Sequence, residues 1–248
     1  MNVWDIALIA VVSVMGTAVA YLRHAEMKAT VLMLPVPFSL AILAVGRPLD
    51  ATNVLSMGLL FGFSLGVWIL RAKLHWPIVT AIAVCATGYC LAGAWLTGLD
   101  LSGPAVFWAS AAFLLASAVV LIRLLPHRDE PHHVTSLPVW IKTPLIALVI
   151  GGLVLIKPYL GGFMTMFPMV GVVAAYEARN SLWAIVRHIP WVIVIMVPMM
   201  GTIYLTQSRV GVSTSLLLSW PLLLSLLWGL RSHYMGARQV APLVSRRA

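Results

Sequence analysis

The sequence predicts an all-α polytopic membrane protein with nine transmembrane helices, arranged as one N-terminal helix followed by two parallel four-helix repeats. Three observations support this fold class: an apolar composition, a series of long apolar runs, and cations that alternate between the connecting segments. Of the 248 residues, 61% are hydrophobic and 9% are charged, and the mean hydropathy is +0.99. Soluble domains have about a quarter charged residues, so this chain has too little polar surface to cover a water-soluble globule.

Nine apolar runs, bounded by charged or turn-forming residues, are candidate membrane spans. A bilayer core about 30 Å thick requires about 20 helical residues at about 1.5 Å each. The second, third, sixth and seventh runs are shorter than this, so we expect snorkelling flanks or shielding by neighbouring helices. The first run ends at Arg23 without a small-residue cleavage site, so we interpret it as a retained helix and not as a signal peptide. The nine runs cover residues 3–22, 29–46, 53–70, 77–97, 104–122, 141–156, 160–176, 189–206 and 211–230.

The distribution of cations predicts how these spans are oriented. The connections that follow even-numbered spans contain only Arg47, Lys157 and Arg209, so the other face has 13 of the 16 Lys and Arg residues (16 minus 3). Short loops rich in cations stay in the cytoplasm, which predicts an N-terminus outside and a C-terminus inside. The loops near Asp50 and Asp100 then lie outside. The net charge of +9 is explained by cytoplasmic loops that face anionic lipids, and we expect no nucleic-acid partner.

Two segments that each follow an apolar run are similar to one another. The segments "VGRPLDATNVLSMG" (45–58) and "LIKPYLGGFMTMFP" (155–168) each contain a cation, then proline, then leucine within two residues. The two cations, Arg47 and Lys157, are 110 positions apart (157 minus 47). This similarity suggests that spans two to five are a diverged copy of spans six to nine.

A second pair of segments keeps nearly the same spacing. The segments "KLHWPIVTAIAV" (73–84) and "VRHIPWVIVIMV" (186–197) each open a span with His-x-Pro, and His75 and His188 are 113 positions apart (188 minus 75). Each copy has four spans, an even number, so both copies enter the membrane in the same orientation, which predicts a pseudo-two-fold axis along the membrane normal. The predicted units are an N-terminal transmembrane helix (1–28), a first four-helix repeat (29–128), a cytoplasmic linker (129–139), a second four-helix repeat (140–234) and a cytoplasmic tail (235–248).

The second copy contains a group of residues that resembles a known family. The group consists of a Phe-Pro pair in a short span, alanine and tyrosine at its end, and a downstream proline before Tyr-Leu. These residues are Phe167, Pro168, Ala174, Ala175, Tyr176, Pro198, Tyr204 and Leu205. The pattern resembles the small four-span GlpM-type membrane proteins, so the chain looks like a fused pair of such units, although the first copy lacks the Phe-Pro. The resemblance implies a multi-pass protein of the bacterial inner membrane, with a periplasmic N-terminus under the orientation above, that is linked to exopolysaccharide (alginate) production. It assigns no catalytic residue.

The predicted binding site centres on the two cations of the outer face. Arg47 and Lys157 lie at the outer ends of the second and sixth spans, and Tyr159, Gly161 and Gly162 follow Lys157. One interpretation is that both cations snorkel to the head groups, which costs little at a helix end compared with about 2.5–3.5 kcal/mol at its centre. The other interpretation is an external vestibule that binds an anionic group. The two glycines would then allow close approach of the backbone, and the helix start would offer free N–H groups.

His75 and His188 complete the predicted set of substrate-binding residues. Each opens a span on the cytoplasmic side, two residues before a proline. Proline in the first turn is an ordinary helix start, and an interfacial histidine is often simply solvated. A proton-linked role is the alternative, because histidine titrates near neutral pH.

Other chemistry receives little support from the sequence. The segment "PHRDEPHH" (126–133) has residue types that bind metals, but it is a polar connector bracketed by prolines, so we predict no metal site. No Asp or Glu lies in the middle of a predicted span, which disfavours proton- or cation-coupled carriers. His-Glu-x-x-His, Gly-x-Ser-x-Gly, paired intramembrane aspartates and phosphate-binding glycine loops are all absent from the sequence, so we predict no enzyme and no cofactor.

Three functions remain as hypotheses, and the least favoured of them is a membrane-embedded enzyme. The first is a permease-like inner-membrane protein that moves or binds an anionic lipid or a small solute at the interface between the repeats, with membrane lipids as its partners. The second is a non-catalytic membrane subunit that supports cell-envelope or exopolysaccharide biosynthesis, together with an envelope-biosynthesis protein or as a homodimer. A central cavity would favour the first hypothesis, and a solid centre with an apolar lateral surface would favour the second.

Overall fold

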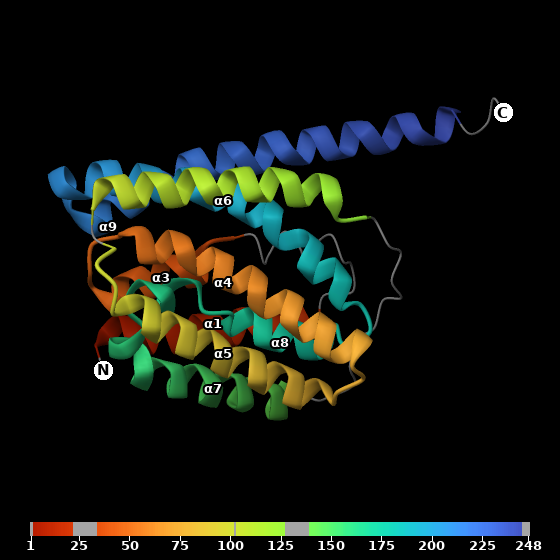
Figure 1. Cartoon of the computed structure of the whole chain (residues 1–248), viewed down its shortest axis with the longest axis horizontal. Helices are drawn as coiled ribbons and strands as arrows, with labels where there is room; N and C mark the ends of the chain where they lie inside the picture. The colour runs from red at the N-terminus through yellow and green to blue at the C-terminus, as the bar shows by residue number, and fades with distance from the viewer. Residues whose placement is uncertain (1, 22–33, 102, 127–138, 245–248) are drawn as a thin grey trace.

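The computed structural model describes residues 2–21, 34–101, 103–126 and 139–244, and this part of the chain is helical without strands. The predicted all-α class is therefore confirmed for these residues. Figure 1 shows an elongated bundle whose helices lie roughly side by side. In chain order the elements are α1 (Val3–Tyr21), α3 (Val36–Val45), α4 (Ala51–Trp68), the π-helical turn η1 (Ile69–Lys73), α5 (Ile78–Thr97), α6 (Pro104–Leu124), α7 (Val139–Leu160), the 3-10 helix η2 (Gly161–Met166), α8 (Met169–Glu177) and α9 (Leu182–Val244).

Several helices have the length and composition of membrane spans. Five segments are long and apolar enough to cross a bilayer, and α1 and α3 contain shorter apolar stretches. These helices support a membrane protein, whereas the count of nine spans and the repeat stay predictions. The five segments are Ala51–Lys73, Ile78–Thr97, Pro104–Leu124, Ile146–Met166 and Leu182–Gly229.

The flanks of the bundle carry large apolar side chains on their surface. Leu91, Phe113, Leu148 and Leu217, which belong to four different helices, are each at least 66% exposed. Contiguous apolar patches are rare on the surface of soluble monomers, whereas exposed leucine and phenylalanine occur here on four helices. They are what a surface in contact with lipid chains requires.

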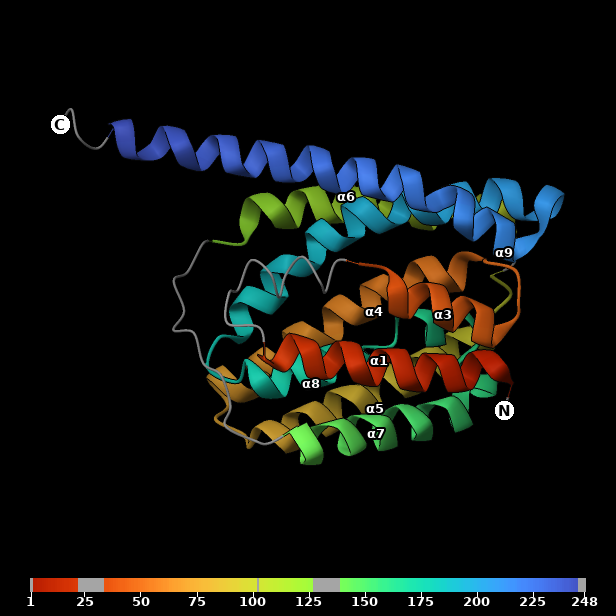
Figure 2. The same ribbon diagram turned by 180° about the vertical axis from the view of Figure 1, so that it is seen from behind.

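α9 contains two of the predicted spans in one continuous element. The bend lies at Gly211, where φ is 79° and ψ is 163°, so the runs 189–206 and 211–230 lie on either side of it. The chain runs to one end of the bundle and returns from there, as Figures 1 and 2 show. No atom lies within 4 Å of a Cβ placed on Gly211, so the left-handed backbone, and not a lack of space, explains the glycine.

The predicted seventh span, 160–176, is an interrupted helix. η2 ends at Met166, the chain is extended at Phe167 (φ −53°, ψ 134°), and α8 begins after Pro168. Proline has no N–H to continue a helix and forces the residue before it out of the helical region. The Phe-Pro pair therefore divides this apolar run into two short helices.

The interior consists of two buried apolar clusters, and α4 contributes to both. One cluster joins α4 to α6 and α9, and the side chains of Met57, Phe107 and Met199 are fully buried in it. The ring of Phe107 stacks on Tyr204 at 3.9 Å. The other cluster joins α4 to α1, α5, α7 and η2 around Phe163. α4 is therefore the central helix of the bundle.

α1 and α7 lie side by side in opposite directions. Asp5, near the start of α1, contacts Lys157, near the end of α7, while Thr17 and Thr143 hydrogen-bond at the other ends of the two helices (3.0 Å). The first and sixth predicted spans would cross a membrane in opposite directions, and α1 and α7 do run in opposite directions.

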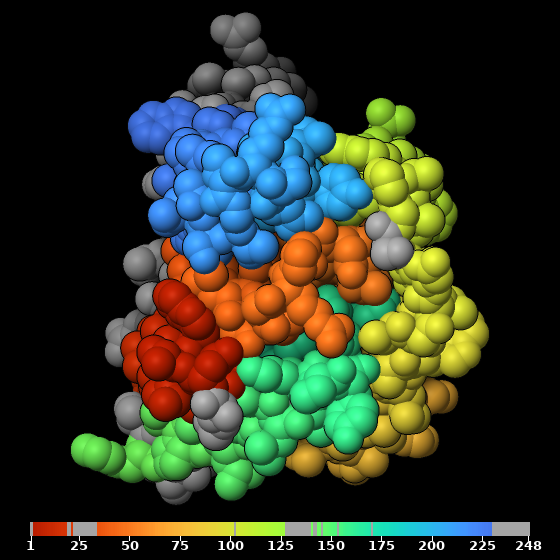
Figure 3. Space-filling model, turned by 90° about the vertical axis from the view of Figure 1, so that its left-hand side faces the viewer, coloured from red at the N-terminus to blue at the C-terminus, as the bar shows by residue number. Residues whose placement is uncertain are grey.

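The connections gather at two ends of the bundle. We call one the Asp50 end: it contains the α3–α4 loop, the residues after α5, the start of η2 and the bend of α9, and it faces the viewer in Figure 3. We call the opposite one the Arg71 end: it contains η1, the turn between α8 and α9, and the end of α6, where Trp183 donates to the Pro126 carbonyl (2.9 Å). Asp50 and Asp100 lie at one end and Arg71 and Arg179 at the other, and the side of a membrane that each end faces stays a prediction.

Candidate functional site

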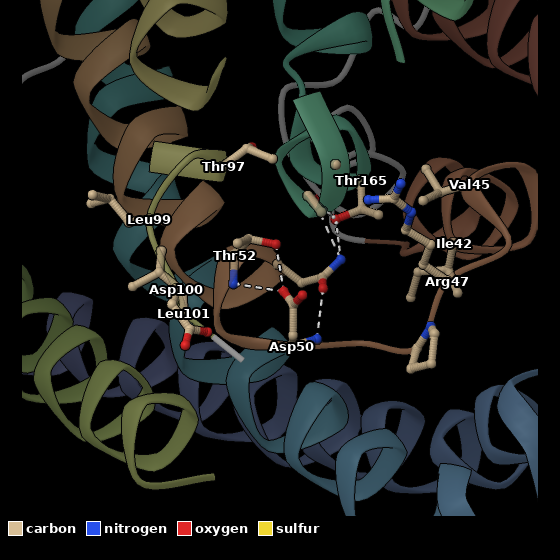
Figure 4. A pocket seen from close by; sticks show the side chains of 14 residues that line it. Ile42, Val45, Arg47, Asp50, Thr52, Thr97, Leu99, Asp100, Leu101 and Thr165 are labelled. Carbon is tan, nitrogen blue, oxygen red and sulfur yellow. Dashed lines mark hydrogen bonds between the residues drawn. The ribbon is translucent and has the colours of Figure 1, made fainter. Parts of the chain in front are cut away.

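A polar pocket of about 160 Å³ opens at the Asp50 end. Figure 4 shows that its lining comes from the end of α3, the α3–α4 loop and the start of α4, from the end of α5 with the following loop, and from η2. The charged residues in this lining are Arg47, Asp50 and Asp100. Sites for drug-sized ligands have about 300–1,000 Å³, so this Asp50-end pocket suits a smaller molecule.

The start of α4 forms one wall of the pocket. Asp50 is the N-cap, and its carboxylate accepts hydrogen bonds from the Thr52 N–H (2.8 Å) and the Thr52 hydroxyl (2.5 Å). The Asn53 side chain accepts a bond from the Asp50 N–H (2.9 Å), which completes a capping box. The positive end of this helix therefore already has a carboxylate of the protein itself.

Asn53 also holds the interrupted segment in place. Its Nδ2 donates to the Gly162 carbonyl (3.3 Å) and to Thr165 Oγ1 (3.1 Å), and Thr165 donates to the same carbonyl (2.7 Å). A Cβ on Gly162 would lie 2.0 Å from Thr52 Oγ1. The glycine is therefore required for the close approach of η2 to α4.

A stripe of α5 receives η2 from the other side. Tyr89, Gly93 and Thr97 are spaced by four, so they share one face of the helix. The Tyr89 hydroxyl donates to the Phe163 carbonyl (2.8 Å), and the single Thr97 hydroxyl proton is shared between the Gly93 carbonyl of its own helix (2.8 Å) and the Leu160 carbonyl (3.3 Å). A Cβ on Gly93 would be 3.1 Å from the Cβ of Phe163. The Tyr89 bond gives the Phe163 carbonyl of η2 a hydrogen-bond partner on α5.

Lys157 lies outside this pocket and forms an ion pair. Its ammonium is 2.5 Å from Asp5 Oδ1 and 3.0 Å from the Ala44 carbonyl in the last turn of α3. Asp5 is fully buried and also accepts a bond from the Asn2 N–H (2.7 Å), and Asn2 Nδ2 donates to Ala44 (3.2 Å). Lys157 therefore joins α7 to α1 and to the negative end of α3. This ion pair differs from both interpretations of the sequence, in which Lys157 either extends to the lipid head groups or faces an external vestibule.

The structure brings together only part of the predicted binding set. Arg47, Gly161 and Gly162 line the Asp50-end pocket, whereas Tyr159 is 73% exposed on α7 and is not part of the lining.

The two histidines lie away from this pocket. His75 lines a second pocket at the Arg71 end, and His188 lies in the first turns of α9. The predicted roles of both stay hypotheses.

Sequence reasoning missed the acidic and hydroxyl residues of the pocket. Asp50, Thr52 and Asn53 form a recognisable capping pattern before α4, and Asp100 falls on the same predicted face as Asp50. Both signals were present in the sequence, but the prediction considered cations alone on that face.

Metal ligation finds no support in the described part of the chain. No group of three His, Cys, Asp or Glu side chains that could hold a metal ion occurs among the described residues. Of the segment 126–133, all but Pro126 lies outside them.

Comparison of the chain with family models, curated proteins and solved structures finds no match. The GlpM-type resemblance stays a prediction.

Proposed function

We propose that this chain is a permease-like inner-membrane protein that binds and moves a small solute with an anionic group through the Asp50-end pocket. The observation that carries the proposal is the interrupted helix η2–α8, which lies beside a polar pocket in an otherwise apolar bundle. Within a membrane, irregular backbone is tolerated only where protein buries it or where it lines a cavity. Interrupted helices of transporters commonly form substrate sites.

The lining of the pocket suggests which solute fits. Arg47 and the backbone at Gly161 and Gly162 offer a positive charge and a closely approachable main chain, as an anionic group requires. Asp50 and Asp100 lie in the same lining, so a solute that also carries hydrogen-bond donors or a positive group is accommodated best. Of the two predicted ligand classes, an anionic lipid and a small solute, the volume favours the small solute.

The pocket lies between the two proposed repeats. Arg47, Asp50 and Asp100 belong to the segment 29–128, whereas Gly161, Gly162 and Thr165 belong to the segment 140–234. In this proposal α9 crosses the membrane twice, once on each side of its bend, and α3 and η2–α8 complete the second and seventh of nine spans. The Asp50 end faces the periplasm, and the cation-rich Arg71 end faces the cytoplasm.

Binding and uptake by the full chain test this proposal. We expect purified protein in nanodiscs to bind small carboxylates, more tightly when they also carry an amino group, and reconstituted protein to carry them into liposomes. Arg47→Gln removes a charged hydrogen-bond donor, which is worth about 1.5–3 kcal/mol, so the affinity should fall about tenfold or more. Arg209→Gln is the matched control, because Arg209 is exposed at the same end and outside the lining. Equal affinities of wild type and Arg47→Gln would contradict the proposal.

A specific observation favours the second function, a non-catalytic subunit of an envelope-biosynthesis machine. The middle of the bundle is filled by fully buried side chains such as Met57, Phe107, Phe163 and Met199. A filled centre with apolar flanks suits a subunit that contacts an envelope-biosynthesis protein or a second copy through its sides. In that case Arg47→Gln leaves polysaccharide production unchanged, whereas Leu91→Arg or Leu217→Arg on the exposed flanks reduces it.

A further inference from the structure

A second pocket, of about 220 Å³, lies at the Arg71 end of the bundle. Its lining comes from the junction of α4, η1 and α5 and from the turn between α8 and α9, which meet at the right-hand end of Figure 1. Trp68, Arg71, His75, Arg179 and Asn180 contribute its aromatic and polar groups. This site is separate from the Asp50-end pocket and has no part in the transport proposed there.

The charged side chains in the lining of this Arg71-end pocket are basic. Two guanidinium groups and an imidazole line it, and none of the described residues in its lining is acidic. A further cation lies at its rim, where the Lys73 ammonium is 5.5 Å from the centre of the Trp68 ring. The nearest acid along the chain is Glu177, which is buried at the end of α8 and outside the lining. Guanidinium groups bind phosphate oxygens in pairs of parallel hydrogen bonds, which distinguishes them from simple point charges.

The backbone on one side of the pocket has an unusual conformation. η1 is a π-helical turn over Ile69–Lys73, and His75 follows it with φ at +58°. A non-glycine residue in the left-handed region costs on the order of 1–3 kcal/mol, and such positions and π-turns gather at functional sites. Arg71 Nη1 donates to the Trp76 carbonyl (3.2 Å) across this turn. The turn thereby places Arg71 and His75 in one lining.

Aromatic side chains surround this pocket, as is typical of sites at the depth of lipid head groups. The Trp68 ring packs against Trp183 at 4.7 Å, and the Arg179 guanidinium lies 5.5 Å from the centre of the Tyr176 ring. Trp76, beside the pocket, is 39% exposed. Tryptophan and tyrosine concentrate at membrane–water interfaces. In the proposed orientation, which is taken from the proposed function, a cation-rich site at that depth would meet the anionic lipids of the cytoplasmic leaflet.

We propose that the Arg71-end pocket binds a phosphate group, presented either by the head of an anionic lipid or by a free phosphate. Arg71 and Arg179 hold its oxygens, His75 and Asn180 donate to it, and Trp68 forms the apolar wall. The volume suits a phosphate with a small substituent. The proposal is independent of transport through the Asp50-end pocket, because the two pockets share no lining residue.

The experiment uses the full chain in phosphatidylcholine nanodiscs in two arms. In one arm the nanodiscs contain increasing phosphatidic acid, and lipid bound to the protein is counted by native mass spectrometry. In the other arm inorganic phosphate is titrated into nanodiscs of phosphatidylcholine alone. Saturable binding in the first arm identifies a lipid head group, and saturable binding in the second arm identifies a soluble phosphate. Absence of saturable binding in both arms overturns the proposal.

Variants decide whether binding uses this pocket. Arg71→Gln and Arg179→Gln should each weaken phosphate binding about tenfold, because each removes a charged donor. Arg123→Gln is the matched control, because Arg123 is an exposed cation near the same end and outside the lining. Arg71→Lys keeps the charge but loses the paired hydrogen-bond geometry, so its phosphate affinity should lie between those of wild type and Arg71→Gln. If Arg71→Gln folds poorly, the comparison of Arg71→Lys with wild type still tests the role of the guanidinium. An equal loss in Arg123→Gln overturns the pocket as the site.

Discussion

The ion pair between Lys157 and Asp5 provides a direct test of how the bundle is held together. Asp5 is fully buried, whereas the Lys157 side chain is 22% exposed, and the two are 2.5 Å apart. Lys157→Met removes the ammonium and keeps most of the apolar stem. Among the described residues, the carboxylate of Asp5 then keeps its bond from the Asn2 N–H, and Ala44 at the end of α3 loses the Lys157 donor and keeps the Asn2 amide.

The expected magnitude follows from burial. Removal of one partner of a fully buried pair costs about 3–5 kcal/mol, because a charge remains without compensation. Lys157 is partly exposed, so water replaces part of the lost interaction, and we expect a loss of about 2–3 kcal/mol in the free energy of unfolding. Asp5→Asn combined with Lys157→Met should recover much of this loss, because no buried charge remains. The coupling free energy of the two sites should then be about 1–3 kcal/mol.

Equilibrium unfolding in mixed micelles, measured for wild type, both single variants and the double variant, checks this expectation. Lys73→Gln is the control, because Lys73 is an exposed cation at the Arg71 end, and it should change stability by less than about 1 kcal/mol. A coupling free energy near zero would refute the assignment of Lys157 to Asp5. It would also restore the hypothesis that Lys157 is a free cation at the membrane surface.

Two further predictions concern the glycine beside α4 and the orientation of the chain. Gly162→Ala should destabilise the protein by about 2 kcal/mol or more, because its Cβ would overlap Thr52 Oγ1. The control is Gly151→Ala, where nothing lies within 4 Å, and it should be neutral or stabilising by up to about 1 kcal/mol. Similar unfolding curves for the two variants would contradict the packing of η2 on α4. In a variant without Cys85 and Cys90, a cysteine at position 50 should react with an impermeant maleimide from the periplasm, and one in the connector 123–140 should not; labelling of that connector from the periplasm would reject the nine-span orientation.

The limits of most helices were predictable because local signals mark them. α5 (Ile78–Thr97) and α6 (Pro104–Leu124) match the runs 77–97 and 104–122 closely, since Pro77, Gly98 and Pro104 punctuate the sequence. The run 160–176 was predicted as one span because hydropathy measures apolar length alone and does not register that Pro168 stops a helix. The 63-residue α9 shows the converse case, since two predicted spans lie in one element with a bend at Gly211.

The site was less predictable than the helices because its contacts join distant parts of the chain. The sequence identified Arg47, Gly161 and Gly162, which do line one pocket. The partner of Lys157 is 152 positions away (157 minus 5), and a pairing over that distance depends on how α1 packs against α7. The prediction weighed the cations of the outer face and left out Asp5, although an acid and a lysine on one predicted face are natural partners.

The stripe of α5 that receives η2 determines how the bundle can move. Tyr89 and Thr97 bind carbonyls on either side of the point where Phe163 packs against Gly93. Separating α5 from η2 therefore breaks three contacts at once and exposes main-chain carbonyls to an apolar surrounding. On its other side η2 packs closely on α4, where the Asn53 amide donates to Gly162 and Thr165 and where Gly162 approaches Thr52. Widening the pocket at η2 would therefore break contacts with α4 and with α5 together, so we expect these three elements to move as one unit or not at all.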